Sequence, residues 1–187
     1  MREPLLYPLT RFFAQDGRDL PEFDVVESAD VPEPCHALLV HHGDMTSRLE
    51  EFHGGSLVLE VLHWEQDANA YRREVLLRVA GSGLAVEYGA IEINLAAFAP
   101  ELRDDVLAAR QPLGGLLNAH GLAYRSEPRA FIRVAPSDAM KEVFGDAAAR
   151  ELYGRCNLLL GEDGTTLAHI VEVLRPHSPR INEAGSP

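Results

Sequence analysis

Apolar and polar residues alternate along three neighbouring segments in the middle of the chain. Alternation of this kind is typical of β-strands that turn one face toward a core. In the third segment the alternation fades toward its end, as expected where both faces of a sheet are covered. The pattern predicts an antiparallel meander with strands from Ser56 to Trp64, from Tyr71 to Ala80 and from Leu84 to Asn94.

Further strands are predicted in the second half of the chain. A segment from Tyr124 to Val134 has strand character but is interrupted by Pro128, which cannot donate a hydrogen bond to a neighbouring strand. The segments from Tyr153 to Leu160 and from Thr165 to Leu174 are joined by Gly161-Glu162-Asp163-Gly164, a strong hairpin signal. These short connections favour an antiparallel sheet.

Helices are predicted between these strands. The capping-box pattern Ser47-Arg48-Leu49-Glu50 opens a helix that should end at Gly54-Gly55. Apolar residues recur at helical spacing from Pro100 to Arg110 and from Asp138 to Leu152, and Pro112 suits the first turn of another short helix. Helices packed on an antiparallel sheet make the expected fold class α+β.

The two ends of the chain lack these regular patterns. Prolines and a glycine interrupt the apolar clusters near the start, so residues 1–35 are expected to form an N-terminal arm with one short helix. Residues 177–187 have little to bury and are expected to form a disordered tail. The main domain is expected to span residues 36–176, within a chain of 187 residues that is long enough for one substantial core.

The formal net charge is −12 at pH 7. Such a charge repels phosphate backbones and anionic lipid surfaces, so neither nucleic acid nor a membrane surface is an expected partner. Every hydrophobic run is interrupted before it reaches the roughly 20 residues that cross a bilayer, so membrane insertion is not expected either. An anionic small molecule would need a local cationic site, which gives weight to any arginine among apolar residues.

Cysteines and histidines carry no recognisable metal pattern. Cys35 and Cys156 are far apart, and the start of the chain lacks a basic and then apolar signal segment, so a reduced, cytoplasmic protein is expected. His41 and His42 are adjacent, and adjacent residues of a strand point to opposite faces. We therefore predict no metal site. Phosphate-binding loops and nucleophile elbows are absent as well.

Two charged residues stand alone in apolar strand-like runs, Arg73 and Glu172. Alternation places Arg73 on the face of Val75 and Leu77, where it could either form an ion pair at a sheet edge or bind a ligand carboxylate through two parallel hydrogen bonds. Glu172 is either directed into an apolar interior or solvated at a sheet edge. The residues alone leave both choices open.

Two other segments offer backbone donors rather than reactive side chains. The run Pro112-Leu113-Gly114 begins a predicted helix, whose first N–H groups can receive a carboxylate. Met45 offers a backbone N–H and an adaptable apolar side chain, although Asp44 or Thr46 could equally serve only as a helix cap. Taken singly, both segments favour a structural role.

Taken together, four short segments resemble the chorismate pyruvate-lyase family in their order and separation. That family carries an Asp-x-Met-Thr or similar segment, an Arg-Glu-Ile-Leu-Leu strand, a Pro-Leu-Gly turn and a final Thr-Glu-x-Phe-Leu-Pro strand. The resemblance covers the chain from about Leu38 to Pro176. The matching segments here are Asp44-Met45-Thr46, Arg73 to Leu77, Pro112 to Gly114 and Glu172 to Pro176.

The resemblance implies an antiparallel sheet with packed helices and an internal ligand cavity, an architecture that also occurs in ligand-sensing domains of transcription regulators. It implies a cofactor-independent carbon–oxygen lyase that eliminates pyruvate from chorismate to leave 4-hydroxybenzoate. Arg73, with backbone N–H groups at Met45 and Leu113 beside Gly114, would bind the ring carboxylate. Glu172 would lie at the hydroxyl-bearing end and act as the general acid.

Departures from the family pattern indicate a divergent member. Where family members of the ubiquinone pathway usually carry an arginine in the third strand, this chain reads Glu87-Tyr88-Gly89-Ala90-Ile91. Glu87 is either a second acid in the expected cavity or a solvated strand residue. Two alternatives to the chorismate reaction follow: a lyase-like enzyme acting on another cyclic carboxylate, and a non-catalytic module that binds an aromatic acid.

Overall fold

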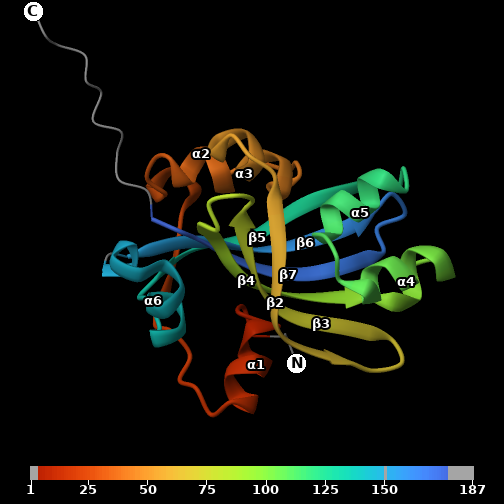
Figure 1. The fold of residues 1–187 in the computed structure, drawn as a ribbon, viewed down its shortest axis with the longest axis horizontal. Coiled ribbons are helices and arrows are strands. Elements are labelled where there is room, and N and C mark those ends of the chain that lie inside the picture. Colours follow the sequence, from red (N-terminus) through yellow and green to blue (C-terminus); the bar gives the residue numbers. More distant parts are fainter. Residues whose placement is uncertain (1–3, 150, 177–187) are drawn as a thin grey trace, which may run out of the picture.

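A computed structural model describes residues 4–149 and 151–176 of the chain. Its centre is a 7-stranded sheet in the order β1-β5-β6-β7-β4-β3-β2, and all neighbouring strands are antiparallel (Figure 1). The expected α+β class and the antiparallel meander are confirmed. The strands are β1 (Phe23–Val26), β2 (Leu57–Gln66), β3 (Ala70–Val79), β4 (Ala85–Asn94), β5 (Tyr124–Val134), β6 (Leu152–Gly161) and β7 (Thr166–Leu174).

Helices cover both faces of the sheet (Figure 1). On one face, α1 and α6 bury aromatic and aliphatic side chains against the central strands. On the other face, α2 and α3 pack over one end of the sheet, and α4 and α5 pack over the other. The helices are α1 (Leu9–Gln15), α2 (Cys35–Leu39), α3 (Met45–His53), α4 (Pro100–Ala108), α5 (Leu113–Ala119) and α6 (Asp138–Phe144), with short 3-10 turns at Ser28–Asp30, Leu95–Ala97 and Gly145–Ala149.

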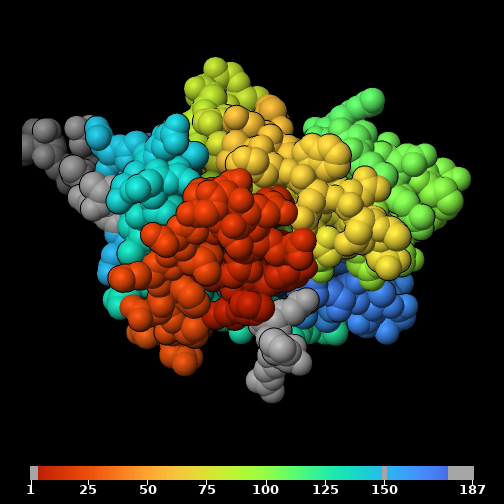
Figure 2. All heavy atoms as spheres, turned by 90° about the horizontal axis from the view of Figure 1, so that it is seen from below, coloured from red at the N-terminus to blue at the C-terminus, as the bar shows by residue number. Residues whose placement is uncertain are grey.

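The segment before residue 36, expected to be an arm, is built into the sheet and the core where the structure describes it. Strand β1 pairs with β5, with Phe23 opposite Val134. Helix α1 buries Leu9, Phe12 and Phe13, each about 1% exposed. Figure 2 shows this segment spread over the underside of the molecule, between α6 and the β2–β3 hairpin. The expected tail, residues 177–187, lies outside the described residues.

Three local predictions need correction. The segment around His36, for which no helix was predicted, forms helix α2. Helix α3 begins at Met45 rather than at the capping box, because the Asp44 side chain accepts hydrogen bonds from the N–H groups of Thr46 and Ser47. Helix α6 ends at Phe144, because Gly145 adopts a φ of 59° that breaks the helix well before Leu152.

A buried carboxylate fastens the N-terminal segment to the sheet. Glu74 is 0% exposed and accepts hydrogen bonds from both terminal nitrogens of Arg18, at 3.0 and 2.8 Å. Tyr88 and His63 also hydrogen-bond to it. Asp16 and His63 lie close enough to Glu74 to resemble a metal site. Both oxygens of Glu74 are already engaged by Arg18, so the group is better described as an ion-pair cluster.

Candidate functional site

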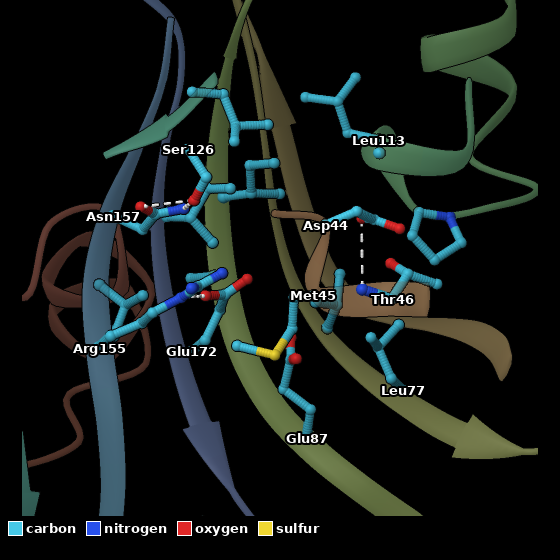
Figure 3. A pocket seen from close by; sticks show the side chains of 18 of the residues that line it. Asp44, Met45, Thr46, Leu77, Glu87, Leu113, Ser126, Arg155, Asn157 and Glu172 are labelled. Atoms are coloured by element: carbon cyan, nitrogen blue, oxygen red, sulfur yellow. Dashed lines mark hydrogen bonds and ion pairs between the residues drawn. The ribbon is translucent and has the colours of Figure 1, made fainter. Parts of the chain in front are cut away.

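A cavity of about 70 Å³ lies on the sheet between the α2–α3 pair and the α4–α5 pair. Its floor is formed by β3, β4, β7 and β6, and its rim by the first residues of α3 and α5 (Figure 3). The six residues singled out in the sequence all line this cavity: Met45, Arg73, Glu87, Leu113, Gly114 and Glu172. The fold thus brings together segments that lie more than a hundred residues apart.

Arg73 is a buried cation with an incomplete set of partners. The residue is 1% exposed, and strand pleating places it beside Val75 and Leu77 on the cavity face. One terminal nitrogen, Nη2, donates to the backbone oxygen of Gln111 at 3.4 Å. Nε and Nη1 have no hydrogen-bond partner among the described residues. The alternative of an ion pair at a sheet edge therefore finds no partner carboxylate in the described part of the chain.

Burial changes the electrostatics of Arg73 without removing its charge. Desolvation lowers the pKa of this guanidinium to about 10, and the nearby Tyr71 partly offsets that effect. Its central carbon lies 5.9 Å from the centre of the Tyr71 ring. At neutral pH the group is therefore protonated, buried and open to an anion on the cavity side. An unpaired buried charge is costly, so an anionic ligand would relieve an existing penalty.

Glu172 is held by an arginine that the sequence analysis did not single out. Arg155 lies directly opposite Glu172 in the β6–β7 ladder, and its Nε donates to Glu172 Oε2 at 2.5 Å (Figure 3). Arg155 Nη1 also donates to the backbone oxygens of Leu39 and His41. Both charged side chains are buried. Glu172 is thus directed inward, as one of its two interpretations expected, but as an ion-paired carboxylate rather than a free proton donor.

His41 orders the chain just before the cavity rim. Its Nδ1 accepts a hydrogen bond from the Gly43 N–H at 3.1 Å, and its Nε2 lies 2.8 Å from the backbone oxygen of Leu38. Burial, and then the charge of Arg155, lower the pKa of His41 to about 4. The ring is neutral at physiological pH, so its Nδ1 can accept the hydrogen bond from Gly43. This bond orders the turn that leads to Asp44.

Glu87 is the second acid of the cavity. It is 6% exposed, so it is not the solvated strand residue that one interpretation expected. Its Oε2 has no hydrogen-bond partner among the described residues. Burial, reinforced by the charge of Glu172, raises the pKa of Glu87 well above its usual range. Burial in this cavity therefore favours the protonated form of Glu87 over the ionised one.

The rim is closed by a tight approach between the starts of two helices. Met45 and Leu113 are the first residues of α3 and α5, and both are buried. A Cβ atom at Gly114 would lie 2.3 Å from Asp44 Oδ1, so the Asp44 carboxylate, which caps α3 through Thr46 and Ser47, would have to move. Glycine at position 114 is therefore needed for Asp44 to cap α3 and touch α5 at the same time.

Sequence reasoning missed several polar residues of the cavity, among them Arg155, Ser126 and Asn157. Arg155, like Arg73, is a single charged residue in a mostly apolar strand. The same reasoning applied to Arg155 would have identified it as a candidate cavity residue. Ser126 and Asn157 form a buried pair in which Asn157 Nδ2 donates to Ser126 Oγ at 2.8 Å (Figure 3). Neither stands out in the sequence, because single serines and asparagines are common in strands and turns alike.

Comparison with known proteins supports the fold. The sequence matches no protein-family model and no curated protein. The structure is similar to that of PhnF from Mycobacterium smegmatis, with a TM-score of 0.56 and 15% identity over 73% of this chain and 65% of PhnF. It is similar to the separate effector domain of PhnF at the same TM-score and identity, over 71% of this chain and 88% of that domain. The likeness to full-length PhnF thus spans less than two thirds of that protein.

These comparisons correct the predicted activity. A carbon–oxygen lyase was expected, but the similar structures are PhnF and its separate effector domain rather than a lyase. The pairing of Glu172 with Arg155 gives the physical reason, because a carboxylate held by a buried arginine is poorly suited to donate a proton. The expected exclusion of nucleic acid partners is not supported by these neighbours. Among the described residues, no helix combines the length and apolarity that crossing a bilayer requires.

Proposed function

We propose that this chain is a non-catalytic module that binds a small cyclic carboxylate in the cavity between the two helix pairs. The observation that carries the proposal is Arg73, whose Nε and Nη1 are buried without a partner among the described residues. A carboxylate accepts two parallel hydrogen bonds from a guanidinium, and each charge-assisted bond contributes roughly 1.5–3 kcal/mol. The ligand would supply the anion that the described residues lack.

The walls of the cavity favour a ring next to the carboxylate. Val75, Leu77, Ile91, Leu159 and Ile170 line it with apolar surface. Apolar walls with a few placed polar groups are typical of small-molecule sites. The likeness to the PhnF effector domain supports a sensing role, in which occupancy of the cavity is the signal.

Isothermal titration with benzoate and 4-hydroxybenzoate tests this proposal. Binding is expected for the unmodified protein and should weaken at least about tenfold in Arg73→Met, the loss of one charge-assisted interaction. The matched control is Arg72→Met, because Arg72 points to the opposite face and pairs with Glu92. Equal affinity of the two variants would overturn the assignment of Arg73.

A second measurement separates binding from catalysis. Purified protein incubated with chorismate should release no pyruvate, and chorismate should be recovered unchanged. Turnover at a rate above the uncatalysed reaction would contradict a binding role. Absence of both turnover and carboxylate binding would remove the proposal altogether.

A further inference from the structure

The cavity has two ends of opposite character. Arg73 is the cation of one end, and its free nitrogens have no acid within reach among the described residues. Three carboxyl groups line the cavity: Glu87 and Glu172 come from the paired strands β4 and β7, and Asp44 lies on the rim beside α3 (Figure 3). The cavity is therefore dipolar.

The register of the sheet separates the two ends along β3. Arg73 lies opposite Ile91, and Glu87 lies opposite Leu77, four positions further along the strand. Four residues of a strand span about 13 Å between Cα atoms. The Arg73 and Glu87 side chains take up part of that distance from either end. Both side chains stand on the cavity face, so one ligand with a substituent at each end of a ring could contact both.

Glu87 forms no ion pair among the described residues, and the nearby charge of Arg155 offsets only part of the effect of burial and of Glu172. Arg155 is the cation of that end, and its Nε and Nη1 already donate to Glu172 and to the backbone oxygens of Leu39 and His41. The charged groups that face Glu87 are Glu172 on β7, Arg155 on β6 and Asp44 before α3, so two of the three are acids. Burial, and next the charge of Glu172, oppose ionisation of Glu87 and raise its pKa well above the usual range.

We propose that the ligand is a zwitterion whose carboxylate binds Arg73 and whose protonated amine binds Glu87. The inference rests on the proposed function and adds the second recognition element. A ligand ammonium group next to Glu87 would stabilise its ionised carboxylate, so Glu87 releases its proton to solvent when the ligand binds. One ammonium–carboxylate pair replaces one buried neutral acid, and one proton is released for each ligand bound.

Three matched probes test the second element in the unmodified protein. They are 4-(aminomethyl)benzoate, 4-(hydroxymethyl)benzoate and 4-methylbenzoate, which share the ring and carboxylate and differ only in the group aimed at Glu87. The amine should bind at least about tenfold more tightly than either neutral probe, as expected for a charge-assisted hydrogen bond. Titrations in two buffers with different heats of ionisation should show release of close to one proton for the amine and none for the others.

Glu87→Gln is the matched variant, because it keeps the shape of the side chain and removes its ability to ionise. The variant should lose the preference for the amine and the proton release, while its affinity for 4-methylbenzoate stays within about threefold. Equal affinity of the unmodified protein for all three probes would overturn the proposal of a zwitterionic ligand, while the proposal of carboxylate binding would stand. Failure of all three to bind would overturn both. If the variant does not fold, the probe series and the proton count on the unmodified protein decide the question.

Discussion

Arg155 and Glu172 are directly opposed residues of the β6–β7 hairpin, and the Arg155 Nε lies 2.5 Å from Glu172 Oε2. Their side chains are 1% and 7% exposed, so each charge depends on the other for solvation. Removal of one member of such a pair leaves the other charge buried and unpaired.

Arg155→Met should therefore lower the free energy of unfolding by about 3–5 kcal/mol, because it leaves the Glu172 carboxylate buried without an ion-pair partner. Arg155→Met combined with Glu172→Leu should recover much of that loss, since the double change removes both charges. Urea unfolding of the single and double variants measures the coupling. Strictly additive effects would show that the two side chains do not support one another.

Arg73→Met is expected to have the opposite effect on stability. The substitution removes a buried guanidinium with two unpartnered nitrogens, and relief of such a group is worth about 1–3 kcal/mol. The variant should unfold at a higher urea concentration than the parent and should bind carboxylates more weakly. A gain in stability with a loss of binding is the mark of a site maintained for a ligand.

The neighbouring arginine is the control for this experiment. Arg72 is ion-paired with Glu92 and Asp67 on the opposite face of the same strand. Arg72→Met should reduce stability and leave ligand affinity unchanged. Stabilisation by both substitutions would point to a general effect of apolar side chains in β3, unrelated to the cavity.

Much of the sheet and of the candidate site follows from the sequence, but the Arg155–Glu172 pair does not. Counting outward from the hairpin turn, Leu160 lies opposite Thr166, and an unbroken ladder would place Arg155 opposite Val171. A bulge between Leu159 and Leu160 shifts the register by one residue and brings Arg155 opposite Glu172. One residue of slippage moves a side chain to the other face of a sheet, and no local pattern in the sequence marks this bulge.

The cavity residues that could be predicted share a simple physical signal. Arg73 and Glu172 are lone charges in apolar runs, and such charges must be matched by a partner or a ligand. The packing of the N-terminal segment could not be predicted, because its prolines obscure the periodicity of α1, and β1 is only four residues long. Its position depends on tertiary contacts with β5 and Glu74.

Glu87 should make the stability of the empty protein fall as pH rises. Its pKa is raised in the folded state, so above the unfolded value of about 4.3 the folded protein holds a proton that the unfolded chain has lost. This contribution decreases stability progressively with pH until the folded pKa is passed. In thermal unfolding, the stability of Glu87→Gln relative to the parent should increase as pH rises above the unfolded value of about 4.3. Parallel curves over that range would refute the assignment.

Glu74, in contrast to Glu87, should make the stability of the folded protein rise with pH. Although burial raises the pKa of this carboxyl, hydrogen bonds from Arg18, Tyr88 and His63 lower it overall. A lowered pKa adds stability above the unfolded value of about 4.3, and that stability is lost as pH falls through the folded pKa. Arg18→Met should lower the free energy of unfolding at pH 7 by about 1.5–3 kcal/mol and should weaken the loss seen on acidification.

A suitable control for the acid transition is Arg133→Met. Arg133 pairs with Asp24 at 2.8 Å, but both side chains are well exposed, so little stability depends on the pair. The variant should follow the parent at every pH. If Arg133→Met and Arg18→Met shift the acid transition equally, net charge rather than the Glu74 cluster is responsible.

The contact between Gly114 and Asp44 means that the contents of the cavity can be communicated to the outside of the molecule. Any molecule that fills the space under this contact lies against the first turns of both α3 and α5, whose remaining turns extend to the surface. We therefore expect the distance between these two helices to depend on whether the cavity is occupied. A partner protein or a neighbouring domain resting on α3 and α5 would sense a bound molecule without touching it.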